Sequence, residues 1–171
     1  MSLNNLEDLF IHQLNDLYSA EQQLMDALPK MAKTASTPEL KQALNEHLEQ
    51  TRTQAARLEN IFESMGSRPA RHKCKGMEGI IEEGSEVLHE KGESSVIDAA
   101  IIASAQRVEH YEIAGYGCAR TYAEELGYND AADLLQETLE EEAHTNERLT
   151  MLAEGNINLR ADQAGDTERQ R

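Results

Sequence analysis

Apolar residues recur at helical spacing along four long stretches of the chain. In the first stretch, from Leu3 to Lys33, the large apolar residues form one stripe, made of Phe10, Leu14, Leu17, Leu24 and Leu28. Comparable stripes run through residues 38–65, 95–126 and 130–154. Because an α-helix turns about 100° per residue, this spacing places each stripe on a single face. The pattern therefore predicts four long amphipathic helices that pack through these faces.

Short turn signals separate the first helix from the second and the third from the fourth. Thr37-Pro38-Glu39 combines a capping residue, a proline and an acid, which together indicate the start of a helix. Gly66 is suited to end the second helix, and Gly127 the third, with Asn129 as the cap of the fourth. The first pair and the last pair of helices are therefore expected to be antiparallel hairpins.

The connection from Ser67 to Ser95 is the long one. It contains a short predicted helix near Met77–Glu90, and Ser95-Val-Ile-Asp98 has the spacing of a capping box at the start of the third long helix. Two hairpins joined by one crossover describe an all-α, ferritin-like four-helix bundle with a short extra helix. We expect a single bundle domain over residues 1–155 and a flexible polar tail over residues 156–171.

Composition supports the helical interpretation and restricts the partners. The 171 residues are 4% aromatic and lack tryptophan, so few residues favour strands. A formal net charge of −16 repels phosphate backbones and anionic lipids, and we expect no direct binding of nucleic acid or membrane. No signal-like segment or apolar run of about 18 residues occurs, so a cytoplasmic protein is expected. Cys74 and Cys118 are expected to be free thiols.

Each predicted helix carries a polar residue on its apolar stripe near mid-length. These residues are Glu21, His47, Glu112 and Glu142; Glu109 lies one turn from Glu112, and Glu141 and His144 flank Glu142 as further candidates. Carboxylates are rarely buried unless they are paired or bind a cation. Several carboxylates with one imidazole suit iron or manganese, and four acids largely neutralise two divalent ions. The pattern predicts a site for two divalent metal ions, iron or manganese.

Each of these residues also has an ordinary structural interpretation. Glu21 is compatible with an edge position paired to a lysine or arginine, and His47 with a core histidine hydrogen-bonded to a neighbour. Glu109 and Glu112 are compatible with pairing to Arg107, to Arg120 or to a neighbouring helix, and Glu140–Glu142 is compatible with a solvated acidic run that has one inward member. Because all four helices carry such a residue, one shared metal site explains the pattern better than a separate structural role for each residue.

Four segments of the chain closely resemble the YciF-type family of bacterial stress proteins. They are Asp16-Leu-Tyr-Ser-Ala-Glu-Gln-Gln-Leu24, His47-Leu-Glu-Gln-Thr51, Val108-Glu-His-Tyr-Glu-Ile-Ala-Gly-Tyr116 and Leu139-Glu-Glu-Glu142. The resemblance covers nearly the whole chain up to the tail. It implies a ferritin-like bundle related to rubrerythrin, a dimer and a dimetal centre, without a settled biochemical activity. The spacing of the two glutamates in the third long helix also resembles that of rubrerythrin, and this resemblance carries Glu109 and Glu112 over as ligands.

The sequence departs from the Glu-x-x-His pattern that is typical of diiron proteins. Glu49 is followed three residues later by Arg52 and faces away from the predicted core, whereas Glu141-x-x-His144 keeps the spacing but points inward less well than Glu142. We therefore expect His47 rather than Glu49 to serve the site, and a donor set poor in nitrogen.

The leading hypothesis is a homodimeric dimetal carboxylate protein of the stress response. It would oxidise ferrous iron with oxygen or peroxide, as a ferroxidase, or remove peroxide, as a peroxidase-like oxidoreductase. The alternative is a non-enzymatic structural or interaction protein with a vestigial or structural metal site.

Overall fold

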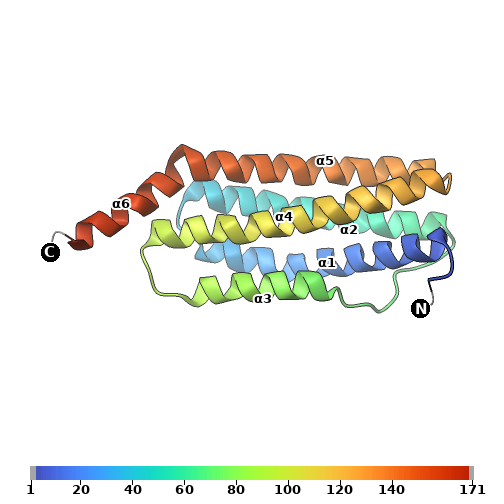
Figure 1. The fold of residues 1–171 in the computed structure, drawn as a ribbon, viewed down its shortest axis with the longest axis horizontal. Helices are drawn as coiled ribbons and strands as arrows, with labels where there is room; N and C mark the ends of the chain where they lie inside the picture. Colours follow the sequence, from blue (N-terminus) through green and yellow to red (C-terminus); the bar gives the residue numbers. More distant parts are fainter. Residues whose placement is uncertain (1–2, 170–171) are drawn as a thin grey trace.

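Two antiparallel helical hairpins form the molecule. The structure, a computed structural model, describes the backbone of residues 3–169 and the side chains of residues 3–164. The first hairpin consists of α1 (Leu6–Thr34) and α2 (Pro38–Ser64), and the second of α4 (Ser94–Glu125) and α5 (Asn129–Leu152). The connection between them carries α3 (Lys75–His89), which lies along the outside of the bundle (Figure 1). The predicted all-α bundle with a crossover and a short extra helix is confirmed.

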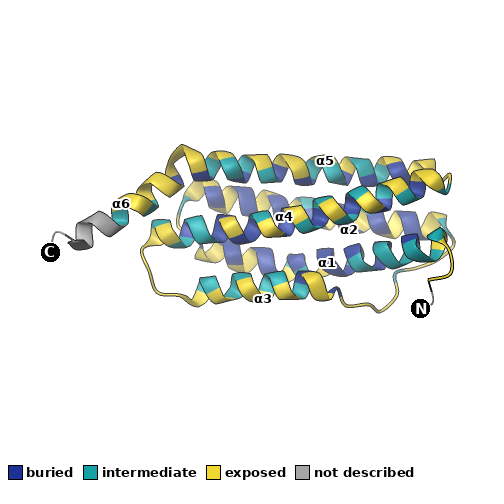
Figure 2. Ribbon diagram, in the orientation of Figure 1, coloured by how far each residue is buried: buried dark blue, intermediate teal, exposed yellow. Residues whose placement is uncertain are grey.

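The helices are arranged so that the four long ones surround a common centre. α1 contacts α2 and α4, and α5 contacts the same two helices from the other side. α3 packs against α1 and α4 and covers the seam between them (Figure 1). The exterior face of α3 is exposed, while the inward faces of the long helices are buried along their length (Figure 2).

The buried apolar residues fall into two separate clusters rather than one continuous core. One cluster lies toward the end where α1 meets α2 and includes Leu24, Leu28, Leu44, Ile101 and Leu149. The other lies toward the opposite end and includes Phe10, Leu14, Leu58, Phe62 and Leu135. The polar residues on the apolar stripes, which include Glu21, His47 and Glu112, lie along the helices between these two apolar clusters. A buried polar layer therefore divides the apolar interior at mid-length.

Asp98 does not cap its own helix. α4 begins one residue earlier than expected, after Glu93, without a side-chain cap. The buried Asp98 carboxylate instead accepts hydrogen bonds from the backbone and hydroxyl groups of Ser36 and Thr37, at 2.5 to 2.9 Å. Burial works to raise the pKa of Asp98, but the hydrogen bonds from Thr37 and Ser36 prevail and lower it. Asp98 thus fixes the turn between α1 and α2 onto α4.

The glycines at the ends of α2 and α4 have the backbone conformation that their turns require. Gly66 has φ of 67° and Gly127 has φ of 78°, in the left-handed region that other residues rarely adopt. At the start of α1, Asn5 is the cap, and its side chain accepts from the backbone of Asp8 at 2.8 Å. The first helix therefore begins a few residues later than the apolar pattern suggested.

Helical structure continues past the end of α5. A π-helical turn, η1 (Ala153–Ile157), leads into α6 (Asn158–Arg169), which contacts α4. Ile157 is buried in the first apolar cluster, although the sequence analysis assigned it to the polar tail. Residues 170–171 of that tail lie outside the described residues, and its flexibility stays a prediction. Within the described residues, no helix combines the length and the apolar character needed to cross a bilayer.

Candidate metal centre

Four buried side chains from three helices converge in the polar layer. They are His47 on α2, Glu109 and Glu112 on α4, and Glu142 on α5, and each offers one ligand atom within 4.8 Å of the others. Glu109 and Glu112 lie three residues apart, so both point to the same side of α4. The sequence expectation that these four residues face the bundle interior agrees with their placement; metal ligation by them stays a prediction.

Most of the polar atoms in this layer have no hydrogen-bond donor from outside the carboxylate cluster. Both oxygens of Glu109 and Glu112 and one oxygen of Glu142 are buried in this way, and only a proton shared between carboxyl groups, Glu109 with Glu142 or Glu112 with Glu21, can satisfy them. The two ring nitrogens of His47 lie 3.2 Å from Glu109 Oε1 and 3.7 Å from Glu142 Oε2, but neither contact has hydrogen-bond geometry. A buried group without a partner costs about 1–3 kcal/mol, and a charged one more. The arrangement is therefore unfavourable for these side chains alone.

Glu21 completes the layer from α1. One of its oxygens accepts a short hydrogen bond from the hydroxyl of the buried Tyr116, and its other oxygen is unpaired. Glu21 lies outside the set of four with mutually close ligand atoms, but electrostatic repulsion from Glu142 acts on it. Each of the four long helices thus contributes at least one side chain to the same layer.

Burial and mutual repulsion shift the protonation of the cluster. Burial, followed by the charge of a neighbouring carboxylate, raises the pKa of Glu21, Glu109 and Glu112 well above the usual range. Burial also raises the pKa of Glu142 to about 7, and it lowers the pKa of His47 to about 4. Without a cation, the cluster therefore retains protons near neutral pH that a bound metal ion would displace.

The donor set fits a divalent metal ion. Four carboxylates and one neutral imidazole offer mainly oxygen ligands, a combination that suits iron and manganese. The unpaired buried atoms are the donors such an ion needs, and the negative charge of the acids would be compensated by it. The residues of this chain are thus compatible with metal binding on chemical grounds.

The two further candidates, Glu141 and His144, lie at the edge of this cluster. Glu141 binds the guanidinium of Arg57 through both oxygens at 2.7 Å, and His144 is exposed. Neither belongs to the group of buried ligand atoms. Glu49 is paired with Arg52 on the surface, and its side chain is 67% exposed.

Sequence reasoning assigned no role to Arg57, and it expected Gln54 or an acid to orient the His47 ring rather than Gln54 to contact the acids of α5. Gln54 donates a short hydrogen bond to Glu142 and a second one, of 3.1 Å, to Glu141. Gln54 and Arg57 are three residues apart on α2, which is a helical spacing. Their partners lie on α5, however, and a single sequence gives no indication of that pairing.

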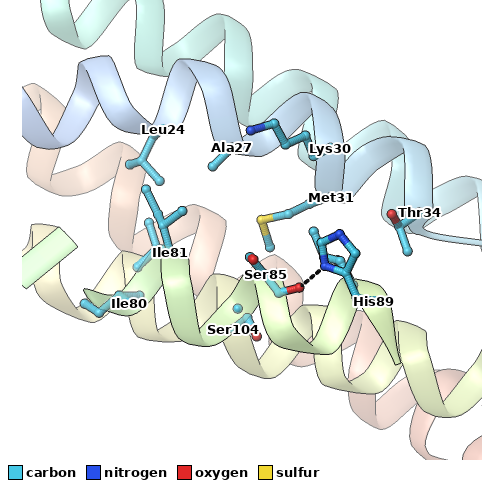
Figure 3. A pocket seen from close by; sticks show the side chains of 13 residues that line it. Leu24, Ala27, Lys30, Met31, Thr34, Ile80, Ile81, Ser85, His89 and Ser104 are labelled. Carbon is cyan, nitrogen blue, oxygen red and sulfur yellow. Dashed lines mark hydrogen bonds between the residues drawn. The ribbon is translucent and has the colours of Figure 1, made fainter. Parts of the chain in front are cut away.

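An apolar cavity of about 370 Å³ lies between α1, α3 and α4. Leu24, Ala27 and Met31 face Ile80 and Ile81 across it (Figure 3). Leu24 is three residues from Glu21, and Val108, which also lines the cavity, precedes Glu109. The cavity therefore adjoins residues that border the polar layer.

The fold and the layer together define a class of protein: an all-α bundle with a buried cluster of carboxylates and one histidine that is compatible with metal binding. Residues 5–162 match a family described as a domain of unknown function, DUF892. The chain therefore belongs to the DUF892 family.

Individual relatives agree with this assignment. The chain is 50% identical to Protein YciF of Escherichia coli (strain K12) over 163 residues, which are 95% of this chain and 98% of that protein. The crystal structure of the E. coli stress protein YciF is similar with a TM-score of 0.88 and 51% identity, covering 91% of this chain and 98% of that one. The resemblance to YciF-type stress proteins is thus confirmed.

Two further solved structures share the fold. YcfI of Rhodopseudomonas palustris has a TM-score of 0.85 and 44% identity, over 87% of this chain and 95% of that one. A protein of Xanthomonas campestris has a TM-score of 0.73 over 94% of this chain and 98% of that one, at 20% identity, and shows the fold alone.

Proposed function

We propose that the polar layer binds two divalent metal ions, iron or manganese, and that the protein acts as a dimetal carboxylate protein in a bacterial stress response. The observation that carries this proposal is the set of buried, unpaired carboxylate and imidazole atoms at the centre of the bundle. Glu109, Glu112, Glu142 and His47 would hold the ions, with Glu21 from α1. The relative that is called a stress protein supports the physiological setting.

The bound metal pair would supply redox chemistry, either the oxidation of ferrous iron by oxygen or peroxide or the removal of peroxide. The chain's own residues orient the ligands. Tyr116 fixes Glu21 by donating to it, and Gln54 fixes Glu142 in the same way. The two apolar clusters on either side keep bulk water from the layer. The apolar cavity beside Leu24 and Val108 offers a small uncharged molecule such as oxygen a place next to the site.

Metal content and oxygen consumption test this proposal directly. The protein is purified without added chelator and its iron and manganese are measured by elemental analysis. Protein stripped with chelator is then given ferrous iron in air-saturated buffer in an oxygen electrode. We expect about two metal ions per chain and rapid oxygen uptake. Protein that binds neither metal after reconstitution would contradict the proposal.

The oxygen-rich donor set also favours a second candidate function. A site with one imidazole suits a structural manganese, magnesium or calcium ion as well as a redox centre. The protein would then be a structural or interaction protein whose working part is its acidic surface. Stoichiometric metal binding without oxygen uptake or peroxide loss would favour this candidate over the first.

We further propose that the protein is a cytoplasmic homodimer. Exposed apolar side chains occur on α4, α5 and α6 toward one end of the bundle, at Val96, Met151 and Leu159. Contact with a second copy at this end would remove these side chains from water. Light scattering at micromolar concentration should give twice the mass of the 19.1 kDa chain; a monomer would contradict the dimer.

A further inference from the structure

Hydrogen bonds across the α2–α5 interface connect the buried layer with the surface. Gln54 is 1% exposed, and its amide nitrogen donates both to Glu142 inside the layer and to Glu141 outside it. The Glu141 side chain is 28% exposed. A single amide group therefore separates a buried carboxylate of the site from a carboxylate that water reaches.

Arg57 closes the outer side of this connection. Its guanidinium binds both oxygens of Glu141 at 2.7 Å and lies 3.3 Å from the Thr138 hydroxyl and 3.4 Å from Glu137. A bidentate pair of this kind holds both side chains in one orientation. With 16% of its side chain exposed, Arg57 lies at the boundary between the interface and solvent.

The surface outside Arg57 is a shallow depression rich in acidic groups. Its lining consists of Gln50, Arg57, Glu137, Glu140, Glu141 and His144. Arg57 is the one basic side chain of lysine or arginine type in that lining, so the remaining groups favour the approach of a cation.

A second observation, inside the interface, indicates that the species entering it is a cation. The carbonyl oxygen of Gln54 is buried and has no hydrogen-bond partner, although its amide nitrogen has two. This oxygen lies on the side chain that contacts both Glu141 and Glu142. It is an acceptor with no donor from the protein, which is what a passing metal ion would use.

The cavity between α1 and α3 adjoins the layer near Leu24 and Val108, but none of the layer's carboxylates lines it. On the α1–α4 side, a Cβ atom at Gly115 would lie 2.8 Å from Leu17, so the two helices are in close contact there. Among the described side chains, the α2–α5 interface is the one place where hydrogen bonds lead from a carboxylate of the layer to a partly exposed charged residue.

We propose that divalent cations reach and leave the site through the α2–α5 interface, and that Arg57 acts as a latch on this route. The inference rests on the proposed metal site. A cation attracted to the acidic depression competes with Arg57 for Glu141. When the guanidinium dissociates from Glu141, the cation enters the interface. The ion then passes from Glu141 past the Gln54 carbonyl to Glu142. Arg57 is thus a positioning residue that controls the rates of exchange.

The test compares rates with affinity in three proteins stripped of metal by chelator. They are the wild type, Arg57→Gln, and the matched control Arg52→Gln, which removes the same charge from a 53% exposed position on the same helix. Cobalt(II) is the probe: its absorbance in stopped flow gives the association rate, a chelator chase gives the dissociation rate, and titration gives Kd.

We expect Arg57→Gln to raise both rates about tenfold, because two charge-assisted hydrogen bonds no longer have to break before passage. Kd should change much less than either rate, and Arg52→Gln should behave as the wild type. If Arg57→Gln does not fold, Arg57→Lys keeps the charge but loses the bidentate contact, and it should show a smaller increase in both rates.

The failures of the two proposals are distinguishable. If none of the proteins binds cobalt, manganese or iron, the metal site itself is wrong. If all bind and Arg57→Gln exchanges at the wild-type rate, the site stands and the latch is wrong. A variant that alters dissociation and Kd but not association would likewise overturn the latch, because Arg57 would then act on the bound ion and not on its passage.

Discussion

Replacing Glu112 with glutamine should make the metal-free protein more stable while removing its response to metal. Both Glu112 oxygens are buried and unpaired, and burial with the charge of Glu21 raises its pKa. Glutamine has nearly the same shape, cannot ionise, and brings amide donors among acceptors. Relief of one unsatisfied buried group is worth about 1–3 kcal/mol. For a chain of 171 residues this corresponds to a Tm rise of about 2–12 °C.

Thermal melts with chelator and with excess manganese measure both effects. Wild-type protein should gain about 2.7 kcal/mol when free manganese is about a hundredfold above its Kd. The Glu112→Gln variant should gain little, because it lacks a central ligand. Glu49→Gln is the control: this residue is exposed, and its change should shift stability by less than about 1 kcal/mol in either condition. A Glu112→Gln protein that melts lower than wild type in chelator, or keeps the full manganese shift, would refute the reasoning.

Three other outcomes are expected. His47→Ala should lower manganese affinity at least about tenfold, whereas Glu49→Ala should do little, as measured by titration; the reverse ranking would show that α2 contributes differently. The metal-free protein should lose stability in denaturant melts as pH rises from about 6.5 to 8. In that window the raised pKa of Glu142, about 7, and those of its neighbours mean that the folded state holds more protons than the unfolded one. Folded His47 is neutral, whereas unfolded His47 loses its proton near pH 6.5, so this one group opposes the trend only at the lower edge of the window. A metal-free stability that is flat or rises across this window would contradict the carboxylate cluster. Ala27→Phe, which fills the cavity between α1 and α3, should slow oxygen uptake with ferrous iron while leaving manganese affinity unchanged; equal rates would exclude the cavity as an oxygen route.

The inward direction of the site residues followed from helical spacing alone. His47 and Glu49 differ by two positions, or about 200° around the helix, so one buried stripe cannot include both. The structure places His47 inside and Glu49 in solvent. The same reasoning separated Glu142 from Glu141, which are neighbours in the sequence but differ by about 100° in direction.

Interactions between helices were beyond the reach of the sequence. Ser95 and Asp98 have the spacing of a capping box, yet Asp98 binds Ser36 and Thr37, which are about sixty residues away. Local spacing cannot reveal a stronger distant partner. The pairing of Arg57 with Glu141 depends in the same way on the rotation and offset of α2 against α5.

The division of the interior into two apolar clusters has a consequence for local opening. Isolated helices usually fray from their ends, where packing is weakest. Here the apolar contacts are concentrated on either side of the middle, and the middle contains unpaired acids. Without a cation, the least protected amides of the long helices should therefore lie at mid-length, and amide hydrogen exchange would spread outward from the centre of the bundle.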